Sequence, residues 1–144
     1  MKRVVFSFGI VITAVLIGTA ALACEMNFTI FSSDGETVGV RPGKSVTLET
    51  EQTYTMAVEF VQDHRQCIVP AGDTVFLLEE EKWKTGKDYL PLLLLSQSGW
   101  REVAPGIWEQ EIVFSAQESG TAALEVIRDC PKGGYDETLL FKIK

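Results

Sequence analysis

Residues 63–67 are the part of the chain richest in groups that can bind a metal ion or carry a proton. They include His64, the only histidine, and Cys67, three residues further on. An imidazole and a thiolate at this spacing can ligate one soft metal ion, with Cys130 or Met56 completing a copper or zinc site. A structural zinc site needs four such ligands, so a metal or redox site at His64, Cys67 and Cys130 is an alternative rather than the leading interpretation.

The same pair is a weak candidate for nucleophilic catalysis. Cys67 would be the nucleophile and His64 its base, but two close neighbours on one loop lack an evident third group to orient the base. They also lack an evident substrate pocket. We therefore expect a protein that is not an enzyme and that uses no cofactor.

The chain has three cysteines, Cys24, Cys67 and Cys130, and an odd count in an oxidising compartment leaves one thiol to be explained. Modification of Cys24 would remove the odd thiol. Cys67 and Cys130 could then pair and close a loop of about 60 residues, which stabilises a fold by roughly 4 kcal/mol in the chain-entropy model. The sequence thus predicts a Cys67–Cys130 disulfide.

The first 23 residues have the features of an export signal. A basic start, Met1-Lys2-Arg3, precedes an uncharged apolar stretch over residues 4–23. The stretch ends in Ala21-Leu22-Ala23, with small residues at the −3 and −1 positions of a signal-peptidase site. With Cys24 it resembles a bacterial lipoprotein signal, although such signals usually carry Leu at −3.

We therefore expect residues 1–23 to be a signal peptide and residues 24–144 to be one exported domain. The resemblance implies that Cys24 is lipidated and anchors the domain to a membrane of the cell envelope. Simple secretion, or release into a periplasm, is the second expectation. An uncleaved anchor is the third, because twenty apolar residues are long enough to span a bilayer.

Acidic residues outnumber basic ones. The chain has 20 acidic and 13 basic residues and a net charge of −7. Removal of residues 1–23 takes away two basic residues, Lys2 and Arg3, and no acidic ones. Residues 24–144 therefore have 11 basic and 20 acidic residues and a net charge of −9. A negatively charged surface does not neutralise phosphates, so we do not expect nucleic acid as a partner. The expected partner is a protein in the cell envelope or outside the cell.

Beyond residue 24, short apolar stretches alternate with turn residues, which predicts strands. Along residues 53–61, for example, Tyr54, Met56, Val58 and Phe60 share one side, as in a half-buried strand. The predicted strands cover residues 27–31, 37–40, 45–50, 53–61, 74–79, 89–95, 107–114, 121–128 and 138–143.

This spacing predicts an all-β fold, an antiparallel immunoglobulin-like β-sandwich of seven to nine strands. A sandwich core usually holds a tryptophan, and we assign Trp108 to it. Trp83 and Trp100 lie beside charged or turn residues, where a fully buried indole is unusual, and their roles stay open.

Residues 106–114, 118–122 and 124–128, with an early stretch at 43–48, resemble strands of chagasin-type inhibitors of papain-like cysteine proteases. The resemblance implies an immunoglobulin-like sandwich that inserts three loops into a protease cleft. Residues 128–131 would fall at the family's Arg-Pro-aromatic loop, and residues 103–106 near its glycine-rich loop. The chain lacks an Asn-Pro-Thr-Thr-Gly loop, and Asp129 and Cys130 separate Arg128 from Pro131. Protease inhibition is therefore an alternative function, and the resemblance bears mainly on the fold.

If residues 53–61 form the second strand of the sandwich and residues 121–128 the penultimate one, the loops after them emerge at the same end. Cys67 and Cys130 can then meet. A competing register sends Cys67 to the opposite end, beyond the roughly 7 Å Cα separation that a bridge tolerates. The first register predicts one surface around the bridge, and we place a partner-binding site there, formed by His64, Arg65, Arg128, Asp129 and Lys132. The leading function is therefore an exported, lipid-anchored, non-catalytic binding module of the cell envelope.

Overall fold

The computed structural model describes residues 24–40, 43–62, 68–131 and 133–144. The expected signal peptide, residues 1–23, lies outside the described residues. The rest is an all-β fold of two facing sheets, as the sequence predicts, with one 3₁₀ turn at Ala71–Asp73. No helix within these ranges is long and apolar enough to cross a membrane.

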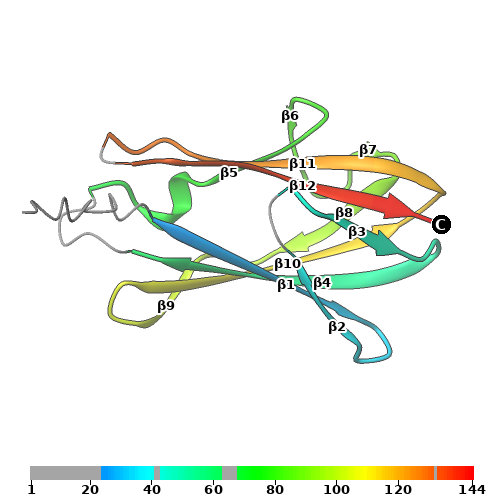
Figure 1. Ribbon diagram of the computed structural model, residues 1–144, viewed down its shortest axis with the longest axis horizontal. Coiled ribbons are helices and arrows are strands. Elements are labelled where there is room, and N and C mark those ends of the chain that lie inside the picture. The colour runs from blue at the N-terminus through cyan, green and yellow to red at the C-terminus, as the bar shows by residue number, and fades with distance from the viewer. Residues whose placement is uncertain (1–23, 41–42, 63–67, 132) are drawn as a thin grey trace, which may run out of the picture.

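The two sheets form the two layers of a sandwich (Figure 1). The larger sheet, sheet A, has the strand order β2-β1-β4-β10-β8-β7, with β9 also pairing with β10. Its strands are β1 (Glu25–Ser32), β2 (Thr37–Val40), β4 (Gln52–Val61), β7 (Asp88–Tyr89), β8 (Leu92–Gln97), β9 (Arg101–Ala104) and β10 (Ile107–Ala116).

The smaller sheet, sheet B, has the order β3-β12-β11-β5-β6. Its strands are β3 (Ser45–Leu48), β5 (Val75–Leu78), β6 (Glu81–Lys82), β11 (Gly120–Arg128) and β12 (Tyr135–Ile143). Strand β3 runs parallel to β12, whereas all other described pairs are antiparallel.

All nine predicted strands coincide with strands of the structure, but the described residues form twelve strands rather than seven to nine. The predicted strand at residues 89–95 is two strands, because the turn at Leu90 and Pro91 separates β7 from β8. Proline has no N–H to donate to a ladder and is therefore favoured at such a turn. The sequence did not predict β6 and β9, which are short and mostly exposed.

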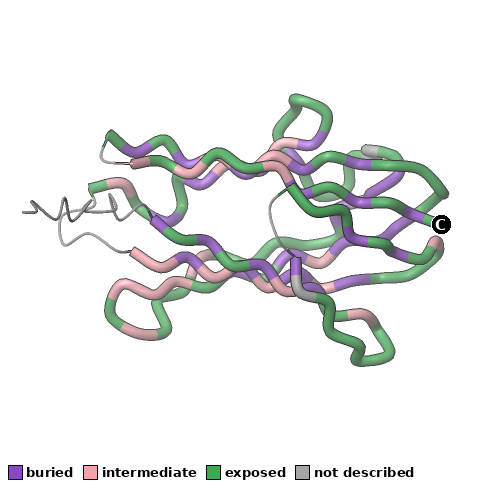
Figure 2. The backbone as a smooth tube through the Cα atoms, viewed as in Figure 1, coloured by how far each residue is buried: buried purple, intermediate pink, exposed green. Residues whose placement is uncertain are grey.

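The core lies between the sheets, where inward residues of both layers meet (Figure 2). Phe114 of β10 is fully buried at its centre. Its ring centroid lies 5.8 Å from that of Tyr54 on β4, 5.6 Å from that of Trp83 and 6.0 Å from that of Phe141 on β12. Aromatic pairs at these separations add to the free energy gained from burial, so this cluster holds the two sheets together.

The turn between β5 and β6 has an unfavourable backbone conformation. Leu78 pairs with Glu81, so the hairpin has a two-residue loop, and both loop residues have positive φ, 51° at Glu79 and 65° at Glu80. Turns of this kind favour Asn-Gly, because Gly has no Cβ atom to clash in the left-handed region and Asn tolerates this region better than Glu does.

Replacing the loop with Asn-Gly, as Glu79→Asn with Glu80→Gly, should therefore raise the free energy of unfolding by about 1 to 2 kcal/mol. Urea unfolding measures the change. Glu118→Asn, on an exposed turn without positive φ, is the control and should change the stability by less than about 0.5 kcal/mol. Equal effects of the two changes would show that the backbone of this hairpin is not strained.

Candidate binding surface

Of the five residues of the partner site predicted from the sequence, the structure describes Arg128 and Asp129. His64, Arg65 and Lys132 lie outside the described residues, while Asp129 is exposed just after β11. Arg128 is only 1% exposed. The prediction that Arg128 contributes to a loop surface is therefore wrong.

Alternation along β11 explains the burial of Arg128, because its side chain shares the inner face with Leu124 and Val126. The guanidinium carbon lies 4.1 Å from the centre of the Phe60 ring on β4, a cation–π contact between the two sheets. Nη1 donates to the carbonyl of Pro70 at 2.7 Å, and Nη2 donates to the carbonyl of Val69. These hydrogen bonds offset the cost of burying the charge and hold the segment before β5 against the core.

The same contact shows which loops share an end of the sandwich. Phe60 is near the end of β4 and Arg128 is the last residue of β11, so both strands end on the same side (Figure 1). This confirms the register in which the loops after β4 and β11 emerge together. Cys130 is buried at this end, but Cys67 lies outside the described residues, so the Cys67–Cys130 disulfide stays a prediction.

Of the alternative metal or redox site, His64 and Cys67 lie outside the described residues. Within the parts of the chain that the structure describes, no group of three or more His, Cys, Asp or Glu side chains is arranged to hold a metal ion. Cys24, the expected site of lipid attachment, is a buried member of the core.

The sequence assigns Trp108 to the core and leaves the roles of Trp83 and Trp100 open, and the structure shows how each of them packs. Trp108 is half-buried and packs against the core from β10. Trp83 is only 3% exposed, although Lys82 and Lys84 flank it in the sequence. The two lysines are exposed, whereas the indole is directed into the core. Trp100 packs edge-on against Phe60, with ring centroids 6.4 Å apart. All three contribute to packing.

The outer face of sheet A carries a group of carboxylates that the sequence analysis did not single out. On β4 and β10 the inner positions are apolar apart from the buried Gln110, and the outer positions include Glu59, Glu109 and Glu111. We call these three residues the acidic face. They line a hollow of about 340 Å³ together with small residues, Thr29 and Ala57.

Like charges stand next to each other on the acidic face. Glu59 and Glu109 are directly opposite in the β4–β10 ladder, where Cβ atoms are about 5 Å apart. Such a pair destabilises a sheet. Asn27 donates to Glu59 at 3.1 Å, and Arg101 lies 3.5 Å from Glu109, so both carboxylates have a partner that partly compensates for their repulsion.

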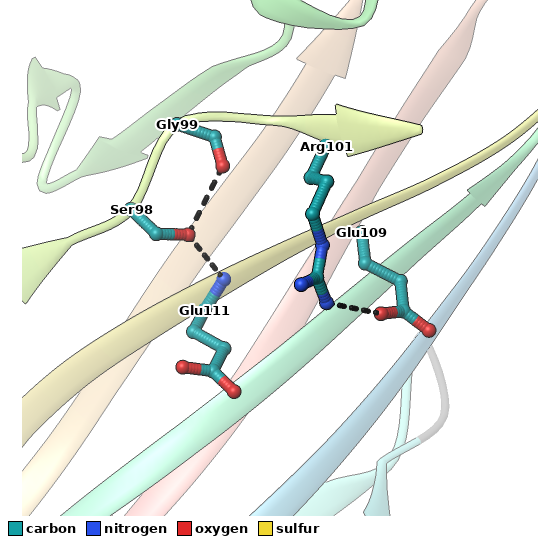
Figure 3. Close-up of polar contacts among 5 residues, drawn as sticks. All are labelled: Ser98, Gly99, Arg101, Glu109 and Glu111. Atoms are coloured by element: carbon teal, nitrogen blue, oxygen red, sulfur yellow. Dashed lines mark hydrogen bonds and ion pairs between the residues drawn. The ribbon is translucent and has the colours of Figure 1, made fainter. Parts of the chain in front are cut away.

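The edge beside β10 positions Glu111 and Arg101 (Figure 3). Ser98 lies between β8 and β9, and its Oγ accepts a hydrogen bond from the backbone N–H of Glu111 at 2.9 Å. Arg101 then reaches from β9 toward Glu109. The side chain of Glu111 has no ion pair among the described residues.

A larger hollow, of about 420 Å³, lies on the outer face of sheet B and is lined by Glu79, Glu80 and Glu125. Lys82 and Lys142 stand in the outer rows of the same sheet, so positive charges are interspersed with the carboxylates. On sheet A, Arg101 pairs with Glu109, but Glu59 and Glu111 have no ion pair among the described residues, so we take this hollow, although smaller, as the candidate binding surface.

The buried hydrogen bonds of Arg128 predict a large effect of its removal. Arg128→Met keeps an apolar stem but leaves two carbonyls without their donor, so it should lower the free energy of unfolding by about 2 to 4 kcal/mol. Arg101→Met removes an exposed guanidinium and should change it by less than about 0.5 kcal/mol in urea unfolding. Similar losses in the two variants would contradict the structural role of Arg128.

Tyr135 gives a prediction for alkaline pH. Burial raises the pKa of Tyr135 to about 12, and the charge of Glu137 acts in the same direction. An unfolded tyrosine has a pKa near 10, so the folded protein binds more protons between these values and should lose stability as the pH rises from about 10 to 12. In an absorbance titration, subtracting the curve of Tyr135→Phe should leave one phenol transition near pH 12. A difference transition near pH 10 would contradict this.

Comparison with known proteins adds no family to these observations, because no protein-family model, no curated protein and no solved structure matches the chain.

Proposed function

We propose that this protein is an exported binding module with an immunoglobulin-like fold, which acts without catalysis and holds a basic segment of a partner protein on its acidic face. The N-terminal export signal supports the location. The carrying observation is the acidic face itself, where Glu59 and Glu109 stand opposite each other at a cost to the stability of the sheet. Binding of a cation would relieve that repulsion.

The strand order supports the immunoglobulin-like part of the proposal. Strand β4 lies between β1 and β10 in one sheet, while β12 lies between β11 and a parallel β3 in the other. The orders β1-β4-β10-β8 and β12-β11-β5 correspond to the ABED and GFC orders of the two sheets of an immunoglobulin-like sandwich.

The geometry of β10 suggests how a partner would be recognised. Glu109 and Glu111 are two residues apart on one face, so their side chains leave the strand about 7 Å apart. An extended peptide repeats its side chains on one face with the same spacing. A partner segment with Lys or Arg at every second position therefore matches the carboxylates, and exposed Phe31 offers an apolar contact beside them.

The alternative of a chagasin-like inhibitor has less support. Residue 128 falls where that family has its Arg-Pro-aromatic loop, but the Arg128 guanidinium lies inside the sandwich and does not face a partner. Inhibition of papain by the purified domain would favour the alternative over the acidic face.

A peptide of alternating Lys and Ser tests the proposal at low ionic strength, where charge pairs are weakly screened. It should bind more tightly than a peptide of the same composition with the order Lys-Lys-Ser-Ser. Changing Glu59, Glu109 and Glu111 together to Gln should weaken binding of the alternating peptide roughly tenfold by calorimetry.

The matched control changes Glu79, Glu80 and Glu125 to Gln, which removes the same charge from the other sheet. It should leave the affinity within about twofold of the wild type. Equal losses in the two triple variants would mean that only net charge matters, and the proposed site would be rejected.

A further inference from the structure

Cys24 is built into the fold as a core residue. It directly precedes β1, and its side chain is 4% exposed within the main hydrophobic cluster. Buried and outward positions alternate from it along the strand, with Met26 and Phe28 buried and Glu25 and Asn27 exposed (Figure 2). Cys24 therefore continues the inner row of β1.

Lipid attachment would place different demands on this residue. The acyl chains of a lipid anchor must enter the bilayer to hold a protein there. A lipid joined to Cys24 through its sulfur would therefore require the side chain to leave the core. Strand β1 begins at the next residue, Glu25, which pairs with Val61, so no spacer separates Cys24 from the sandwich.

Moving Cys24 outward would disturb its neighbours. Met26, the next residue of the inner row, pairs with Phe60. Phe60 in turn supports the guanidinium of Arg128 and the ring of Trp100. The start of β1 is thus coupled to the contacts that close this end of the sandwich.

We infer that Cys24 serves as a core residue and is not the attachment point of a lipid. Ala21-Leu22-Ala23 then acts as an ordinary export-signal ending, with its small residues at −3 and −1. This role of Cys24 is independent of binding at the acidic face, because Glu59, Glu109 and Glu111 lie on the outer face of sheet A and Cys24 lies on its inner face.

Expression of the full chain in a bacterium that lipidates its own lipoproteins tests the inference. Mass spectrometry of the N-terminal peptide should show Cys24 without an acyl mass, and the protein should enter the aqueous phase in a detergent partition. A diacylglyceryl group on Cys24, with the protein in the detergent phase, would overturn the inference.

Two substitutions separate a packing role from a processing role. Cys24→Val keeps an apolar side chain of similar size, and Cys24→Ala leaves a space in the core. Both should be exported and processed as the wild type is, while the alanine variant alone should show a clearly lower urea midpoint.

Glu25→Ala is the control on the same strand and should alter neither property, because Glu25 is exposed. Accumulation of both Cys24 variants as precursors, with an unchanged midpoint for Cys24→Ala, would show that the thiol is needed for lipid attachment instead.

Discussion

The register of β4 against β10 is the constraint on which the rest of this structure depends. The two strands pair over ten consecutive residues, from Ile107 opposite Val61 to Ala116 opposite Gln52. Because side chains alternate between faces, a slip of one residue would exchange the core row for the outer row. One register therefore places Met56 and Phe114 in the core and, by the same geometry, brings Glu59 next to Glu109 on the outside.

The alternation of side chains between the two faces of a strand also explains why Arg128 is buried. Its position on the inner face of β11 brings a charge into the end of the sandwich, where it contacts Phe60 and two carbonyls of the segment before β5. A buried guanidinium is tolerated only with such partners, so the path of residues 68–74 and the ends of β4 and β11 are fixed together. The molecule thus has one end organised by polar contacts, whereas its centre is held by aromatic packing around Phe114.

Much of the fold could be predicted because local alternation is visible in the sequence. The alternation predicts an inner row of Tyr54, Met56, Val58 and Phe60, and all four side chains are buried. Residues whose placement depends on distant partners were missed. Arg128 has a charge that suggests exposure, and the carbonyls that bind it are more than fifty residues away in the chain. The acidic face could not be predicted either, because Glu59 and Glu109 come from strands that are distant in the sequence and are brought together by the fold. Short edge strands such as β9 carry little apolar signal.

The claim that the acidic face is the binding surface is tested most directly by an amide NMR titration of the wild-type domain with the alternating Lys-Ser peptide. The account predicts that the largest shift changes fall on Ala57, Glu59, Glu109 and Glu111, at the outer face of β4 and β10. Changes concentrated instead on Glu79, Glu80 and Glu125, which line the hollow of the opposite sheet, would contradict it.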